Sequence, residues 1–232
     1  MTYNQIISAI EPLVAALRSD PNLELEGALG INLPAKFQSG VDFDYFKSLL
    51  DLINKSDCWN KKDIAIHSAD FFYPDNLRAR YGLSKDPVFA KKRTLHKLDI
   101  SAPSRNYNIR ITLCEEIPSS SPSVKSNSSQ VRLQERWSYW YKHNWRYDFT
   151  KVAQGKHKEA ASKHQPSFEI ELELLPSAFK DTRLSDKELA VHFTEKLLDL
   201  LGRYDSKLQK EKVPLYIKSK WQLYPNTVNG VR

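Results

Sequence analysis

The chain has 232 residues and a mass of 26.9 kDa, and 41% of its residues are hydrophobic, which is enough to form one domain with a substantial core. A formal charge of +7 and a pI of about 9.2 favour an anionic partner, without separating nucleic acid from a small phosphorylated molecule. The seven glycines form no glycine-rich phosphate-binding loop, and no stretch is apolar enough to cross a bilayer as a helix.

These properties predict a soluble, intracellular protein with one domain over residues 1–232 and no membrane partner. The cysteines Cys58 and Cys114 form no CxxC pair, so we expect reduced thiols. Neither cysteine is followed six positions later by arginine, because those positions hold Ile64 and Ser120. A cysteine-phosphatase mechanism is therefore excluded, and the histidines show no paired spacing for zinc.

Helical periodicity occurs in three segments. Apolar residues recur at intervals of three and four over about 5–17, over 43–53 and over about 187–208. Asp42 is placed to cap the second helix, and Ser185 with Glu188 forms a capping box before the third. We expect the first and third helices to pack on the outside of a sheet.

Between the helices the hydrophobic period changes to two. This alternation predicts strands over 23–30, 63–73, 89–100, 107–117, 131–142, 145–152 and 168–175. His143 and Asn144 separate two of these strands closely enough for a tight hairpin. The polar segments 119–130 and 155–166 are predicted to be loops. Many strands and few helices indicate a mainly β protein with a large antiparallel sheet or barrel.

Two of the predicted strands carry carboxylates on one face. Glu169, Glu171 and Glu173 alternate with apolar residues, and so do Glu24 and Glu26. Same-face neighbours lie only about 7 Å apart, so the carboxylates repel unless cations or water intervene. For one strand alone, a solvated outer face explains the pattern equally well. Two acidic faces that meet would form an oxygen-rich site suited to Mg²⁺ or Mn²⁺.

Three other strands carry cations at alternate positions. Their shared faces comprise Arg132, Gln134 and Arg136; Arg146, Asp148 and Thr150; and Arg110, Thr112, Cys114 and Glu116. For any single strand, solvation or cross-strand ion pairing worth about 1 kcal/mol or less is a sufficient explanation. Acidic and basic strands together favour a barrel with a charged interior. Such an interior can clamp a polyphosphate, because arginines fork onto phosphate oxygens while carboxylates hold a cation.

The motifs LELEGALG, RYDFTKV and EIELEL, in this order, resemble the signature strands of the metal-dependent RNA triphosphatases of fungal, protozoan and viral mRNA capping systems. These enzymes belong to the triphosphate tunnel metalloenzyme superfamily, and the resemblance covers about residues 23–175. It implies a closed antiparallel eight-stranded β-barrel with flanking helices. It also implies removal of the γ-phosphate from the 5′-triphosphate end of nascent RNA, the first step of mRNA capping.

The resemblance also assigns roles by motif position. Glu24, Glu26 and Glu173 correspond to direct ligands of Mg²⁺ or Mn²⁺, with Glu169 and Glu171 in support, and Glu116 corresponds to the residue that orients or deprotonates the attacking water. The remaining candidate site residues are Arg132 and Arg136, the strand residues Arg146, Asp148 and Thr150, Arg110 on the face of Glu116, and Arg78 and Lys92 from NLRAR and FAKKR.

The chain departs from the family pattern at two positions. Ala28 stands where a basic residue usually follows the first two glutamates, and Gln134 stands where a lysine is common. No KxDG motif is present, so the implied partners are 5′-triphosphate RNA and a guanylyltransferase on a separate protein. The implied location is the nucleus, or a viral or cytoplasmic capping site.

Two other functions stay open at this point. A tunnel enzyme that hydrolyses inorganic triphosphate or free nucleotides would need the same interior. A non-catalytic RNA-binding module would use the basic faces alone, but five clustered glutamates would repel RNA unless metal were bound.

Overall fold

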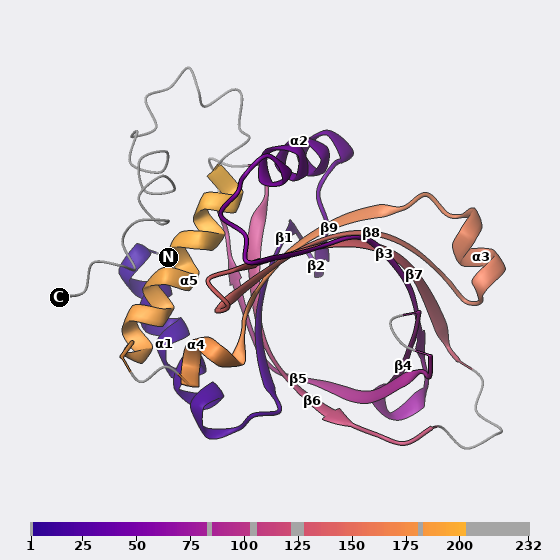
Figure 1. The fold of residues 1–232 in the computed structure, drawn as a ribbon, viewed down its shortest axis with the longest axis horizontal. Helices are drawn as coiled ribbons and strands as arrows, with labels where there is room; N and C mark the ends of the chain where they lie inside the picture. The colour runs from indigo at the N-terminus through magenta and orange to yellow at the C-terminus, as the bar shows by residue number, and fades with distance from the viewer. Residues whose placement is uncertain (1, 83–84, 103–105, 122–127, 181–182, 203–232) are drawn as a thin grey trace.

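The computed structural model describes residues 2–82, 85–102, 106–121, 128–180 and 183–202 (Figure 1). The helices are α1 Tyr3–Ser19, α2 Phe43–Asn54, the 3-10 turn η1 Pro74–Asn76, α3 Lys158–Lys163, α4 Pro176–Lys180 and α5 Asp186–Gly202. The strands are β1 Leu23–Leu33, β2 Lys36–Ser39, β3 Lys61–Phe72, β4 Leu77–Tyr81, β5 Val88–Ile100, β6 Asn108–Pro118, β7 Gln130–Tyr141, β8 Trp145–Gly155 and β9 Ser167–Leu174.

Eight strands form a closed antiparallel barrel, which Figure 1 views end on. Their order is β1-β6-β5-β4-β3-β7-β8-β9, and pairing of β9 with β1 closes the ring. β2 is a ninth strand that pairs only with the far part of β1. Closure satisfies the backbone hydrogen bonds of every barrel strand and gives each strand one inward and one outward face. The predicted mainly β, eight-stranded barrel with flanking helices is confirmed.

Seven of the barrel strands lie where the alternating pattern predicts them, and the eighth was missed. That strand is β4, whose five residues LRARY lie between η1 and Gly82, too short a run to show alternation clearly. The hairpin of β7 and β8 has the predicted tight turn, in which Lys142 and His143 adopt positive φ angles. The loop predicted over 155–166 is wrong in its middle, because α3 forms there with the His157 ring accepting a hydrogen bond from the Ala160 amide.

The apolar core lies between the outer wall of the barrel and the helices. α1, α4 and α5 gather on one side of the barrel, and α2 lies beside them over β8 and β9 (Figure 1). Outward residues such as Leu25, Phe149 and Leu172 are fully buried beneath these helices. The end of the predicted third helix, residues 203–208, lies outside the described residues. No helix in the described ranges is long and apolar enough to span a membrane.

Gly27 determines how closely α5 approaches the barrel. It faces outward between Glu26 and Ala28, and a Cβ atom there would lie 2.5 Å from Cδ2 of Leu197. Leu197 is 1% exposed, so its side chain fills the space that the glycine leaves. The helix and the strand that carries Glu24 and Glu26 are therefore packed directly against each other.

We expect Gly27→Ala to destabilise the protein by about 1–3 kcal/mol, because the added methyl overfills a packed contact. Leu197→Ala alone should cost about 2–5 kcal/mol through the cavity that it leaves. The two losses should combine to less than their sum, because the smaller side chain makes room for the methyl. Urea unfolding of the two single variants and the double variant measures this coupling. Strict additivity would contradict the contact.

Candidate active site

The inward face of the barrel collects the charged residues singled out by the sequence. Residues directly opposite in the register share a face, so Glu26 on β1 faces inward together with Glu173 on β9 and Thr112 on β6. The same register brings Lys92 opposite Glu116, Arg136 opposite Thr150, and Arg146 opposite Glu173. The alternation predicted for each strand therefore converges on one interior.

Lys92 lies among the carboxylates at one end of this interior. Its Nζ atom is 2.9 Å from Oε2 of Glu24 and 2.8 Å from Oε1 of Glu26. A third carboxylate, that of Glu116, lies 3.8 Å away and also accepts a 2.7 Å hydrogen bond from Nη2 of Arg78. Lys92 and Arg78, assigned only by motif position, therefore do contact the predicted acidic residues.

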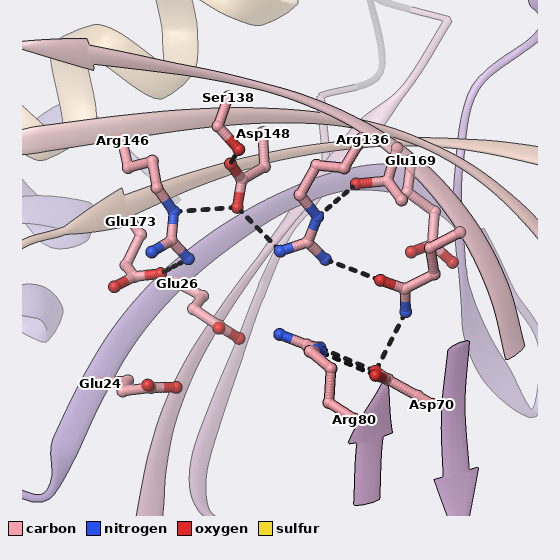
Figure 2. A network of polar contacts seen from close by, with 12 residues as sticks. Glu24, Glu26, Asp70, Arg80, Arg136, Ser138, Arg146, Asp148, Glu169 and Glu173 are labelled. Atoms are coloured by element: carbon pink, nitrogen blue, oxygen red, sulfur yellow. Dashed lines mark hydrogen bonds and ion pairs between the residues drawn. The ribbon is translucent and has the colours of Figure 1, made fainter. Parts of the chain in front are cut away.

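A chain of charged hydrogen bonds continues across β8 to β9 (Figure 2). Arg146 donates from Nε to Oδ2 of Asp148 at 3.0 Å and from Nη2 to Glu173. Arg136 donates to the same Asp148 oxygen at 3.3 Å and to the Thr150 hydroxyl at 3.1 Å. The hydroxyl of Ser138 donates to Oδ1 of Asp148 at 2.6 Å. The buried Asp148 carboxylate thus fixes both guanidinium groups.

A second buried pair, Asp70 on β3 and Arg80 on β4, was missed by the sequence analysis. Arg80 donates to both carboxylate oxygens of Asp70, at 2.6 and 2.7 Å (Figure 2). Gln134 donates to Asp70 at 3.1 Å and accepts from Nη2 of Arg136 at 3.3 Å. The side-chain amide of Gln134, at the position where the family pattern commonly has a lysine, therefore links the Asp70–Arg80 pair to Arg136. Arg80 lies two residues after Arg78 and therefore on the same face of β4, so a prediction of this strand would have indicated Arg80 as a site residue.

Arg132 and Arg110 have different surroundings. Nη2 of Arg132 donates to Glu169 at 2.6 Å, but its Nε is buried with no hydrogen-bond partner among the described residues. A buried donor without an acceptor is costly, and a bound anion would satisfy it. Arg110 instead donates to both oxygens of Asp99, at 2.6 and 2.7 Å, and lies 4.6 Å from the Phe37 ring centre. The structure does not bring Arg110 to the other candidates.

Burial and like charge perturb the acidic residues of β9. Burial, followed by repulsion from Glu26 and Glu169, raises the pKa of Glu171 to about 7. Burial also raises the pKa of Glu173 to about 8, with Glu26 and Glu24 adding to the effect and Arg146 opposing it. For Asp148, burial is outweighed by Arg146 and Arg136, so its pKa is lowered. Burial, with repulsion between carboxylates adding to it, therefore disfavours the charged forms of Glu171 and Glu173 within the acidic group formed by Glu24, Glu26, Glu116, Glu169, Glu171 and Glu173.

The donor chemistry of this group fits a hard divalent cation. Glu24, Glu26 and Glu173 offer only carboxylate oxygens, which Mg²⁺ and Mn²⁺ prefer. In the conformation described, no three acidic, histidine or cysteine groups of the described ranges converge tightly enough to hold an ion. The Lys92 ammonium lies between two of the three predicted ligands. A metal held by these residues would require Lys92 to withdraw from them.

The raised pKa values of Glu171 and Glu173 predict how the metal-free protein responds to pH. A carboxyl group with a raised folded-state pKa stabilises the fold below its unfolded pKa and loses that contribution as pH rises through the folded value. In chelator, Tm should therefore fall by several degrees between about pH 5 and pH 9, since about 1 kcal/mol corresponds to about 2–4 °C at this chain length. Glu173→Gln should flatten the slope, and the outward-facing control Glu135→Gln should retain it. An equal slope in all three proteins would contradict the assignment.

Comparisons with known proteins agree with this arrangement. Residues 24–200 match the family described as "mRNA capping enzyme, beta chain". The chain is 28% identical to the Schizosaccharomyces pombe mRNA-capping enzyme subunit beta over 138 residues, which cover 53% of this chain and 45% of that protein, so it spans less than half of that relative. In three dimensions it resembles the S. pombe Pct1 RNA triphosphatase, with a TM-score of 0.66 at 19% identity over 86% of this chain and 91% of that one. It also resembles the Mimivirus capping enzyme triphosphatase, with a TM-score of 0.62 at 17% identity over 86% and 98% of the two chains. Because the family match covers most of the chain and includes both acidic strands, this protein belongs to the mRNA capping enzyme beta-chain family of RNA triphosphatases.

Proposed function

We propose that this protein removes the γ-phosphate from the 5′-triphosphate end of nascent RNA, the first step of mRNA capping, and that it requires a divalent metal ion. One observation carries the proposal: a single closed interior combines oxygen-only ligands on β1 and β9 with guanidinium groups from β4, β7 and β8. Family membership and the likeness to two RNA triphosphatases support it.

The arginines of the interior are suited to hold a triphosphate. Phosphoryl transfer spreads negative charge over the phosphate oxygens, so catalysis depends on positioning and charge stabilisation. Asp148 and Thr150 hold the Arg136 guanidinium in place before any ligand binds, and Arg132 has a buried Nε ready for an acceptor. Donors fixed in advance need little reorganisation when the anion arrives. We assign phosphate binding to Arg132, Arg136 and Arg146.

Glu24, Glu26 and Glu173 would hold the metal ion, which when bound neutralises charge on the phosphates. Glu116 lies beside Glu24 through their shared contact with Lys92, and it is fixed by Arg78 at 2.7 Å. A carboxylate in this position could accept a proton from a water that attacks the γ-phosphate. We assign orientation and deprotonation of that water to Glu116.

Release of phosphate from 5′-triphosphate RNA, with Mg²⁺ or Mn²⁺ and then in excess chelator, tests the function. Inorganic triphosphate and free nucleoside triphosphates belong in the same assay, because a tunnel phosphohydrolase with another substrate would prefer them. No phosphate release from RNA with either metal would contradict the proposal. Because the sequence shows no KxDG motif, we also propose that guanylyl transfer, the next capping activity, comes from a separate protein at a nuclear or viral capping site.

The role of Glu116 predicts a defect in turnover rather than in binding. Glu116→Gln keeps the shape of the side chain but removes its basic oxygen, so kcat should fall by about 10²–10⁴ while RNA binding persists. Glu115→Gln is the matched control, because Glu115 is the next residue on the same strand and faces outward to Arg93. Steady-state kinetics decides: a normal kcat in the Glu116 variant would remove this residue from the mechanism.

The metal assignment predicts a loss of ion binding. Glu24→Gln or Glu26→Gln should abolish Mn²⁺ binding measured by calorimetry and reduce turnover at least about 100-fold, because each removes a charged oxygen ligand. Tm in chelator should change little, since each change removes one like charge from the barrel but also one charged partner of Lys92. The outward-facing Glu135→Gln should bind Mn²⁺ normally. Unchanged Mn²⁺ affinity in both inward variants would refute the assignment.

Arg136→Lys tests the need for a guanidinium group. A lysine retains the charge but cannot donate simultaneously to Asp148, Thr150 and a phosphate in the planar geometry of arginine. We expect kcat/KM for triphosphate-ended RNA to fall by about 10–100-fold, equivalent to about 1.4–2.7 kcal/mol of transition-state stabilisation. Full activity of this variant would show that charge alone suffices at this position.

A further inference from the structure

One end of the barrel interior opens into a pocket that reaches from the carboxylates assigned above to the rim of the barrel. It lies where β1 and β5 begin and β6 and β9 end, and its volume is about 320 Å³. Its inner wall includes three carboxylates of the acidic group, Glu24, Glu116 and Glu173. The pocket is therefore continuous with the site that would hold the reacting phosphate.

The outer wall of the pocket is apolar and rigid. Val88 and Phe89 at the start of β5 line it together with Pro21, Pro118 and Pro176. Proline rings fix φ and carry no amide hydrogen, so this rim is preorganised and presents apolar surface without unsatisfied donors. Val88 is 53% exposed although it is a branched apolar residue, so the rim offers apolar surface that the described residues leave uncovered.

Asn22 adds one polar group to the rim. Its backbone carbonyl accepts the Glu116 amide at 2.8 Å, and its own amide donates to Asp20 at 2.9 Å. The side-chain amide makes no hydrogen bond to any described residue, and it offers both a donor and an acceptor at the pocket. An apolar wall with one such amide matches a ligand that has a flat ring and a few polar edges.

The opposite end of the interior differs. There the Phe37 ring lies against Gly30, where a Cβ atom would come within 2.6 Å of the ring, and the Arg110 guanidinium lies over the same ring. Arg110 is in turn fixed by Asp99. An aromatic ring and an ion pair thus occupy part of that end, whereas the Val88 end keeps an open pocket.

We propose that this pocket, lined by Val88, Phe89, Asn22 and the three prolines, binds the 5′-terminal nucleoside of the substrate, so that RNA enters at the end of the barrel where β1 begins. The inference rests on the proposed function, because it identifies where the rest of the substrate lies once the triphosphate is inside. The volume of about 320 Å³ lies at the lower limit of the range of about 300–1,000 Å³ for small-molecule sites, a size that suits one nucleoside.

The test compares two substrates that share the triphosphate and differ in the nucleoside. Val88→Trp fills the pocket from an exposed position, so the fold should tolerate it. Its KM for 5′-triphosphate RNA should rise about tenfold or more, the factor that corresponds to about 1.4 kcal/mol of lost binding. Hydrolysis of inorganic triphosphate, which has no nucleoside, should change by less than about twofold. Asn22→Ala should show the same selectivity with a smaller effect.

Leu52→Trp is the matched control, because Leu52 is a comparably exposed branched apolar residue, 45% exposed, on α2 outside the barrel. It should leave both substrates unaffected. The proposal would be overturned if the control variant selectively lost RNA hydrolysis. It would also be overturned if the Val88 variant lost activity equally on both substrates or lost none. A wild-type enzyme that hydrolyses inorganic triphosphate but not RNA would instead contradict the proposed function. If the wild-type protein hydrolyses neither substrate, calorimetry should measure how the wild type and the Val88 variant bind 5′-triphosphate RNA and inorganic triphosphate. The pocket proposal then requires that the variant bind only the RNA more weakly.

Discussion

Mutual compensation of charge inside a closed barrel is the constraint on which the site depends. Five glutamates on β1 and β9 face inward, and burial with like charge raises the pKa values of Glu171 and Glu173 to about 7 and about 8. Lys92, Arg146 and Arg132 each pair with at least one of these glutamates. These cations offset part of the repulsion between the glutamates, and a divalent ion would offset more of it.

The barrel interior can be charged because the apolar side chains of the barrel strands pack on its outer surface. In most domains a sheet buries its apolar face inside, but here the apolar faces of β1, β8 and β9 point outward and are covered by helices. Gly27 lets Leu197 of α5 approach the strand that carries Glu24 and Glu26. The hydrophobic contribution to stability is therefore made outside the barrel, and the interior is left for charge and substrate.

The two departures from the family pattern have different structural consequences. Gln134 is buried and joins Asp70 to Arg136, so this amide helps to orient a guanidinium without itself carrying charge. Ala28 lies opposite Arg110 and Glu171, and its methyl group supplies no cation at that level of the interior. Arg110 faces Ala28, but its Nε and Nη2 donate to Asp99, which offsets its charge. The cations that we assign to phosphate binding therefore come from β7 and β8.

The sequence by itself determined which residues share a face, because strand alternation is a local property. Alternation identified seven of the barrel strands and separated Glu24, Glu26, Glu169, Glu171 and Glu173 from their apolar neighbours, and the order of the motifs indicated the family. It did not identify β4, since five residues are too few to show a period, and so it missed Arg80 and its partner Asp70. It also grouped Arg110 with Glu116 because they share a strand face, although the six positions between them along β6 amount to about 20 Å. Only the tertiary structure decided which inward residues of different strands lie at the same level of the barrel. The physical reason is that strand pairing and tilt depend on contacts between segments far apart in the chain.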